Sequence, residues 1–151
     1  MLSDLAAILG AIHSGQRAAS FESRVLEFKR EKATCEETER DIAEATICLA
    51  NGIGGTVVVG VSDRTAGPGA LLGTALDPDR LRKTIHATSQ PNLLVEVEAQ
   101  THFGVRLVVV RVPTLHISSA MSSGFATSTY SASSVAEVIG LFATVRAFRA
   151  K

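Results

Sequence analysis

The chain has 151 residues, of which 46% are hydrophobic and 20% are charged. This is enough for one domain with a substantial core and too little for two large ones, and the composition is that of an ordinary soluble globular protein. Lys and Arg total 15, as do Asp and Glu, so the net charge is zero. This balance excludes a global basic field of the kind that attracts nucleic acid, so any such site has to be a local patch.

The first 20 residues predict a short amphipathic helix, because Leu2, Leu5, Leu9 and Ile12 recur at helical spacing. Asp4 stands where a signal peptide carries positive charge. No stretch approaches the roughly 20 apolar residues that a membrane-spanning helix needs. We therefore expect a protein that stays in the cytoplasm and does not act at a membrane.

Two cysteines, Cys35 and Cys48, have neither a CxxC nor a zinc-binding spacing. On one helix they would lie about 20 Å apart, which is too far for a disulfide. We expect both thiols to be reduced, as is usual in the cytosol.

A first strand is predicted within residues 24–30, because the apolar and charged side chains alternate. Leu26 and Phe28 would point to one face, and Glu27 and Lys29 to the other. The charges around this strand suit a metal site, a nucleic-acid contact or a solvated face.

A helix follows over residues 34–51. Thr34 and Glu37 have the spacing of a capping box, and Asn51 followed by Gly52 is a suitable C-terminal stop. The predicted buried stripe of this helix consists of Ile42, Ala45, Thr46 and Leu49.

The remaining elements to residue 113 are three strands and one helix. Residues 55–63 form a nearly continuous β-branched run, typical of a strand buried on both faces. Asp77 is the predicted N-cap of a helix that ends near residue 89. Residues 92–100 and 105–112 read as alternating strands joined in a hairpin. The order β-α-β-α-β-β predicts an α/β (α+β) domain with a single mixed sheet flanked by helices.

The character of the sequence changes after Pro113. Residues 114–134 are rich in serine and carry no charge, which is typical of a weakly structured segment. Residues 135–151 then predict an amphipathic helix, whose expected role is to dock on the core. The predicted organisation is thus an N-terminal helix (1–20), a domain (20–113), the serine-rich segment and the C-terminal helix.

A glycine cluster lies between the helix and the second strand. It is not a dinucleotide or P-loop motif, because those place the glycines between a strand and the following helix. A helix cap and a tight turn explain Gly52 well, but Gly54 and Gly55 less completely. The turn would also expose backbone N–H groups that can contact phosphate.

Three carboxylates are candidate ligands for a divalent cation. Glu22 and Glu27 are five residues apart, so they converge only if the chain bends between them, and Asp63 ends the second strand. Oxygen ligands of this kind hold Mg²⁺ or Mn²⁺ in nucleases. The competing interpretation is that these carboxylates are solvated and paired with Lys29 or Arg24. The four histidines form no catalytic or metal-binding motif.

Several motifs in order resemble the Schlafen AlbA-like domain family. They are the E-x-x-x-x-E-F-K strand of Glu22, Glu27, Phe28 and Lys29, the A-N-x-x-G-G helix end at residues 50–55, and the G-V-x-D strand end at residues 60–63. The match covers about residues 20–113. After Pro113 the chain lacks the arginine-bearing strand that relatives usually carry, which puts any contact from that strand in doubt.

The resemblance implies an α/β nucleic-acid-binding module, often dimeric and often part of transcriptional-regulator-like or helicase-related proteins. In the nuclease-active relatives, acids corresponding to Glu22, Glu27 and Asp63 bind the catalytic metal that cleaves structured RNA. Bacterial relatives are described mostly as binding modules.

We therefore expect a binding module without catalysis or cofactor, with DNA as the first candidate ligand and RNA as the second. Its predicted phosphate contacts are Lys29, Arg30, Lys32 and the turn residues Asn51, Gly54 and Gly55. One alternative is a nuclease dependent on Mg²⁺ or Mn²⁺ that uses Glu22, Glu27 and Asp63. Another is a structural or oligomerisation domain, including a homodimer, and zero net charge favours it.

Overall fold

A computed structural model describes residues 2–114 of the chain, so the predicted serine-rich segment and C-terminal helix lie outside the described residues. The elements in order are α1 (Leu2–His13), a 3₁₀ turn (Ala18–Ser20), β1 (Leu26–Lys29), α2 (Cys35–Asn51), β2 (Gly55–Val59), a second 3₁₀ turn (Pro68–Ala70), α3 (Pro78–Thr88), β3 (Glu96–His102) and β4 (Val105–Val112). No helix between residues 2 and 114 combines the length and apolar character needed to cross a membrane.

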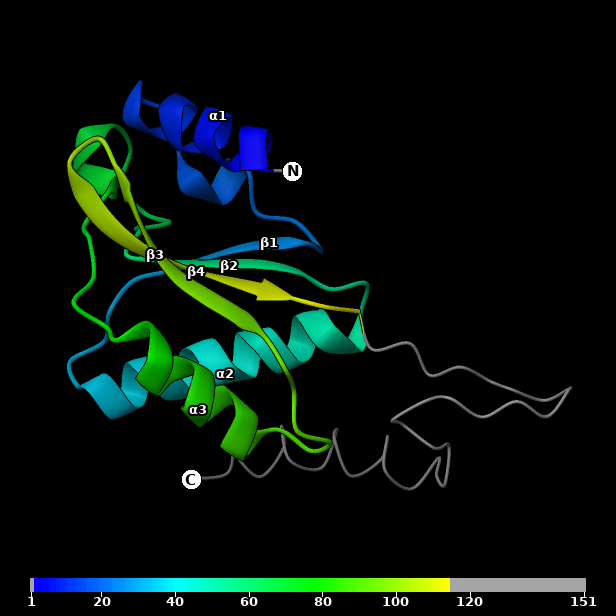
Figure 1. Ribbon diagram of the computed structural model, residues 1–151. Coiled ribbons are helices and arrows are strands. Elements are labelled where there is room, and N and C mark those ends of the chain that lie inside the picture. Colours follow the sequence, from blue (N-terminus) through cyan, green and yellow to red (C-terminus); the bar gives the residue numbers. More distant parts are fainter. Residues whose placement is uncertain (1, 115–151) are drawn as a thin grey trace, which may run out of the picture.

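The four strands form one mixed sheet in the order β1-β2-β4-β3. β1 and β2 are parallel, with Lys29 opposite Val59, whereas β4 is antiparallel to both of its neighbours. Helix α1 covers one face of the sheet, and α2 and α3 cover the other (Figure 1). This arrangement confirms the predicted single mixed sheet flanked by helices.

The sheet separates two apolar cores. On the α1 face, Leu9 and Ile12 pack with Phe28 and with residues of the two central strands. On the opposite face, α2 and α3 pack against Val57, Val59 and alternate residues of β4. Both cores depend on β2, whose Val57, Val58 and Val59 are completely buried. The prediction of a strand buried on both faces is therefore confirmed.

Helix α2 begins and packs as predicted. The Thr34 side chain accepts a hydrogen bond from the backbone N–H of Glu37 at 3.2 Å, which satisfies one of the free amides of the first turn. The expected apolar stripe is buried, including Ile42 and Leu49. Cys35 and Cys48 are both free, and both are exposed.

Three strand predictions need correction. β2 ends at Val59 because Gly60 adopts φ +102°, where a Cβ would lie 2.8 Å from the backbone of Gly73. β3 begins at Glu96 rather than at residue 92, and the hairpin turn is confined to Phe103 and Gly104. β4 is not half-exposed: its residues 107–110 are completely buried because the strand lies inside the sheet, with helices over both faces.

Candidate nucleic-acid interface

Strand β1 is an edge strand whose charged side chains face α2. Phe28 belongs to the core under α1, so its neighbours Glu27 and Lys29 lie on the α2 side, as the alternation predicted. Lys29 Nζ lies 2.7 Å from Glu27 Oε1 and 3.8 Å from Asp41 Oδ1 of α2. Glu27 and Asp41 thus already offset the charge of Lys29.

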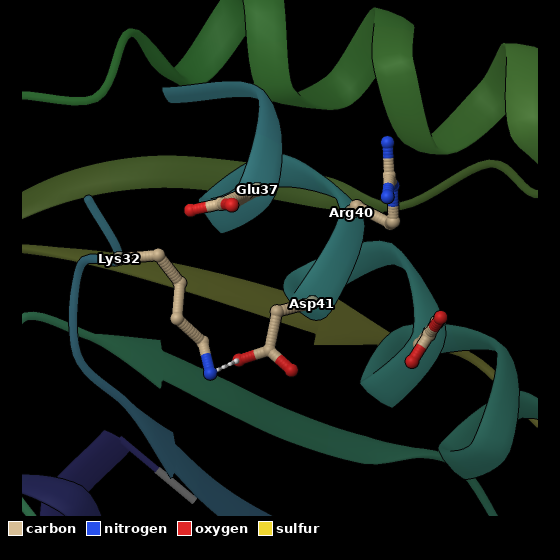
Figure 2. Close-up of a pocket in the computed structure, with 5 residues that line it drawn as sticks. Lys32, Glu37, Arg40 and Asp41 are labelled. Carbon is tan, nitrogen blue, oxygen red and sulfur yellow. Dashed lines mark ion pairs between the residues drawn. The ribbon is translucent and has the colours of Figure 1, made fainter. Parts of the chain in front are cut away.

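Lys32 shares the same helical carboxylate. Its Nζ lies 3.7 Å from Asp41 Oδ2. Figure 2 shows Lys32 and Asp41 pointing toward one another across a pocket of about 320 Å³ that Glu37, Arg40 and Glu44 also line. Three carboxylates against two cations make this pocket a poor site for a phosphate.

The carboxylates also set the titration of Lys29. Burial alone would lower the pKa of this ammonium group, but the hydrogen bond to Glu27 and the charges of neighbouring carboxylates outweigh burial. The pKa of Lys29 therefore lies above its ordinary value of 10.5. The carboxylates that contribute charge are Asp41, Glu27 and Glu22.

Lys29 is expected to stabilise the fold until the solution becomes strongly alkaline. A pKa that is higher in the folded state gives stabilisation that is complete below the unfolded pKa and lost as pH rises through the folded one. The urea midpoint of Lys29→Met should therefore lie below that of the wild type at about pH 9, and the gap should close toward about pH 12. Lys83→Met is the control, because Lys83 forms no ion pair with a described residue, so its gap should stay small throughout. A constant gap for Lys29→Met would contradict the ionic role.

Glu22 folds back onto the edge of β1. The chain bends after Glu22, where the backbone N–H of Ser23 donates to the Leu26 carbonyl. This bend lets Glu22 Oε1 accept a hydrogen bond of 3.3 Å from the backbone N–H of Phe28. The bend therefore brings the Glu22 carboxylate to the backbone of β1.

The three predicted metal ligands are not assembled. Glu22 accepts a hydrogen bond from the backbone N–H of Phe28, and Glu27 forms an ion pair with Lys29. Asp63 is an exposed residue of the loop after β2. Among residues 2–114, no three His, Cys, Asp or Glu side chains are grouped closely enough to hold a metal ion. This arrangement does not fit a three-carboxylate metal site.

Glu31, the last acid of the charged stretch around β1, has a structural role. Its Oε1 accepts hydrogen bonds from the hydroxyl of Thr74 and, at 2.9 Å, from the backbone N–H of Ala75. Arg106 holds the same loop through bonds to the carbonyl oxygens of Thr74 and Leu76. These contacts tie the end of β1 to the segment that leads into α3.

The glycine turn is explained by close packing of the backbone. At Gly54, φ is +77° and a Cβ would lie 2.6 Å from the carbonyl oxygen of Val112; at Gly55, φ is +149° and a Cβ would lie 2.4 Å from the carbonyl oxygen of Val25. Only glycine fits both positions. The N–H groups of Gly52 and Gly54 both donate to the Leu49 carbonyl, so neither is free for phosphate. Packing therefore accounts for the two glycines that the sequence left less completely explained.

The predicted contacts lie at opposite ends of the sheet. Gly55 begins β2 beside Val25, whereas Lys29 lies opposite Val59 at the other end. Four residues of strand, roughly 13 Å, separate the two ends. Asn51, exposed at the last position of α2, remains with the glycine turn. The structure thus does not join the turn and the basic residues into one surface.

Three other cations lie on segments that meet where β1 and β2 end. Parallel strands end on the same side of the sheet, so the segments carrying Arg30 and Arg64 leave it together. Arg17 joins them because it pairs with Ala66, two residues beyond Arg64. All three arginines are exposed, and none forms an ion pair with a described residue. We call Arg17, Arg30 and Arg64 the basic rim.

Only one member of the basic rim, Arg30, could be predicted from the sequence. Arg30 follows the family-like strand, whereas Arg17 and Arg64 are distant from it in sequence. Arg64 directly follows Asp63, so its place at a strand end gave a usable signal. Arg17 gave none, because its position depends on a tertiary bridge. Asp41 was also missed, although an acid early in a helix that covers a strand is a natural partner for Lys29.

Comparison with known proteins shows the fold and the family. None of the curated proteins compared with the chain matches it. The DIP2311 protein from Corynebacterium diphtheriae is 24% identical with a TM-score of 0.55, and the match covers 76% of this chain but 23% of that one. The N-terminal domain of a Nitrosomonas europaea protein, named as related to the ATP-dependent DNA helicase RecG, is 22% identical with a TM-score of 0.51. That second match covers 84% of each chain.

The family assignment rests on sequence. The family model "Schlafen, AlbA_2" matches residues 22–128, which include the charged strand, the glycine turn and the end of the second strand. This match confirms the resemblance that those motifs predicted, and the chain is a member of the Schlafen AlbA_2 family.

Proposed function

We propose that this chain is a nucleic-acid-binding module, with DNA as its expected ligand, within a transcriptional-regulator-like protein. The observation that carries the proposal is the basic rim, where Arg17, Arg30 and Arg64 lie exposed at one end of the sheet and form no ion pair with an acid of residues 2–114. Arginine guanidinium groups are well suited to bind phosphate oxygens in pairs of hydrogen bonds. Family membership and the structural neighbour named as related to a DNA helicase support the same class of ligand.

The basic rim changes which residues make the contacts. Lys29 and Lys32 are engaged with carboxylates, so they would have to exchange these partners for phosphates. Arg30 is the member of the predicted set that needs no such exchange. A local patch of three arginines also reconciles phosphate binding with a net charge of zero.

The first experiment separates binding from cleavage. Labelled duplex DNA and a labelled RNA hairpin are incubated with the pure protein in Mg²⁺, in Mn²⁺ and in chelator, and native and denaturing gels are run in parallel. The proposal expects a shift that weakens steeply with salt and leaves the strands intact in every condition. Absence of a shift with both ligands at low salt would contradict it.

Glu27→Ala is expected to leave binding unchanged or to strengthen it. The substitution removes a negative charge from the edge strand and frees Lys29 from its closest carboxylate. Native gels with wild type and variant at several salt concentrations measure the effect. Metal-dependent cleavage by the wild type that disappears in Glu27→Ala would instead establish the nuclease alternative.

A further inference from the structure

The two edges of the sheet differ in how they are protected. The β1 edge is four residues long, carries inward-facing Glu27 and Lys29, and has the N–H of Phe28 capped by Glu22. Such features prevent pairing with another strand. β3 forms the other edge, with seven residues that include no proline, glycine or lysine. Within residues 2–114 no strand lies beyond β3, so its outer backbone groups have no strand partner in this part of the chain.

The hairpin turn decides which backbone groups of β3 point outward. Phe103 and Gly104, with φ of +52° and +75°, form a two-residue turn that places His102 opposite Val105 as a hydrogen-bonded pair. Hydrogen-bonded and non-hydrogen-bonded pairs alternate along antiparallel strands. The register of β3 with β4 therefore directs the N–H and C=O groups of Val97, Ala99 and Thr101 away from β4.

The side chains of β3 are complementary to themselves. In an antiparallel pair of two β3 strands centred on Ala99, Glu96 lies opposite the partner's His102. Glu98 then lies opposite the partner's Gln100, and Val97 opposite the partner's Thr101. A carboxylate faces an imidazole, a second carboxylate faces an amide, and two β-branched side chains meet, which are favourable cross-strand pairs. No like charges lie directly opposite one another, and the two Glu98 carboxylates, which are diagonal neighbours across the axis, are each paired with Arg111 of their own chain.

The backbone pattern allows the same centre. The outward groups belong to Val97, Ala99 and Thr101, and these are the residues that the Ala99-centred register brings opposite one another. About six backbone hydrogen bonds would form, two at each of three hydrogen-bonded pairs. If the register shifted by one residue, the outward-pointing backbone groups of one strand would face residues of the partner whose backbone groups point away. The hydrogen bonds between the two strands would then be lost.

The polar side chains are already aligned on one face. Arg111 Nη2 donates to Glu98 Oε1 at 2.6 Å, the Gln100 amide donates to the same oxygen, and His102 Nε2 lies 3.0 Å from Gln100 Oε1. This row lies on the α1 side of the sheet, because Glu98 is opposite the buried Val109 of that core. Because these side chains are already ordered in the monomer, less conformational entropy is lost when two β3 strands pair.

We propose that β3 is a self-association edge, at which a second copy of this chain adds in antiparallel register about Ala99 and extends the sheet across a twofold axis. The interface is isologous, since the same strand serves both subunits. Pairing single strands buries less surface than a stable dimer interface, so the dimer is expected to be weak and to form at high protein concentration.

Cysteine trapping at the axis tests the register. Ala99→Cys, made in the full chain with Cys35 and Cys48 replaced by serine, places two thiols opposite one another with their Cα atoms about 5.5 Å apart. Mild oxidation should convert it to a covalent dimer, seen on a non-reducing gel. Ala99 is exposed, so the substitution is expected to be tolerated.

The matched control is Thr101→Cys in the same background. Thr101 faces the partner's Val97, and its equivalent lies about four residues further along the strand, beyond disulfide reach. At least about tenfold more covalent dimer is expected from Ala99→Cys than from Thr101→Cys. Equal trapping of both variants, or none from Ala99→Cys while circular dichroism shows a folded chain, would overturn the proposal.

A charge exchange gives an independent measurement without cysteine. His102→Glu places a carboxylate opposite the partner's Glu96 and should weaken the concentration-dependent dimer seen by sedimentation velocity. The double variant His102→Glu/Glu96→Lys restores opposite charges and should recover association. Gln90→Glu, an exposed change away from β3, should leave association unchanged. Association that is as strong in His102→Glu as in the wild type would also contradict this register.

Discussion

Replacing both Arg30 and Arg64 by glutamate is expected to lower affinity for duplex DNA on the order of 50-fold at about 0.1 M salt. Each arginine that neutralises a phosphate releases counterions, so losing two contacts should also reduce the slope of log affinity against log salt by about two. Fluorescence anisotropy with a labelled duplex across a salt series measures both quantities. The expected loss is uniform across DNA sequences, because phosphate contacts read no bases.

The control for this double variant has to change the net charge equally. Arg24→Glu/Lys83→Glu does so at two exposed cations that form no ion pair with a described residue and lie away from the basic rim. Arg24 precedes β1 at the opposite end of the sheet, and Lys83 lies on α3. If both double variants lost the same affinity for DNA, overall charge would govern binding. There would then be no reason to assign DNA binding to the basic rim.

Replacing Gly54 by alanine is expected to lower the free energy of unfolding by about 3 kcal/mol or more. The added Cβ would meet the Val112 carbonyl oxygen at 2.6 Å and the Thr114 nitrogen at 2.9 Å. Both contacts are with backbone, which cannot rotate away, and overpacking of this kind adds to the strain of a positive φ. Urea denaturation followed by circular dichroism measures the change.

Gly104 separates the two causes of that loss. Its φ of +75° nearly equals that of Gly54, but nothing lies within 4 Å of the position of a Cβ. Gly104→Ala should therefore cost about 1 kcal/mol, the price of the conformation alone. Equal losses at both sites would show that close packing at Gly54 is unimportant. If Gly54→Ala instead kept its stability but lost affinity for DNA, the glycine turn would be part of the DNA-binding surface.

The predicted elements were mostly correct because their signals are local. Thr34 and Glu37 define the start of α2 through a hydrogen bond within one turn, and the apolar periodicity of α2 matches its buried face. Strand ends were less accurate. The end of β2 depends on Gly60 meeting Gly73, and the burial of β4 depends on its place between β2 and β3. Neither contact can be predicted from the residues of the strand alone.

The candidate site shows the same division. The family, the mixed sheet and the orientation of Glu27 and Lys29 on β1 could be predicted from the sequence, because motif order, element order and strand alternation are properties of the chain. Three other features became visible only in the folded chain: Asp41 pairs with Lys29, the glycine turn lies at the far end of the sheet, and the segments of Arg17 and Arg64 meet that of Arg30. The physical reason is that charge pairing and surface patches depend on distances of a few ångströms between segments far apart in sequence, and these distances are set only when the sheet and its helices pack.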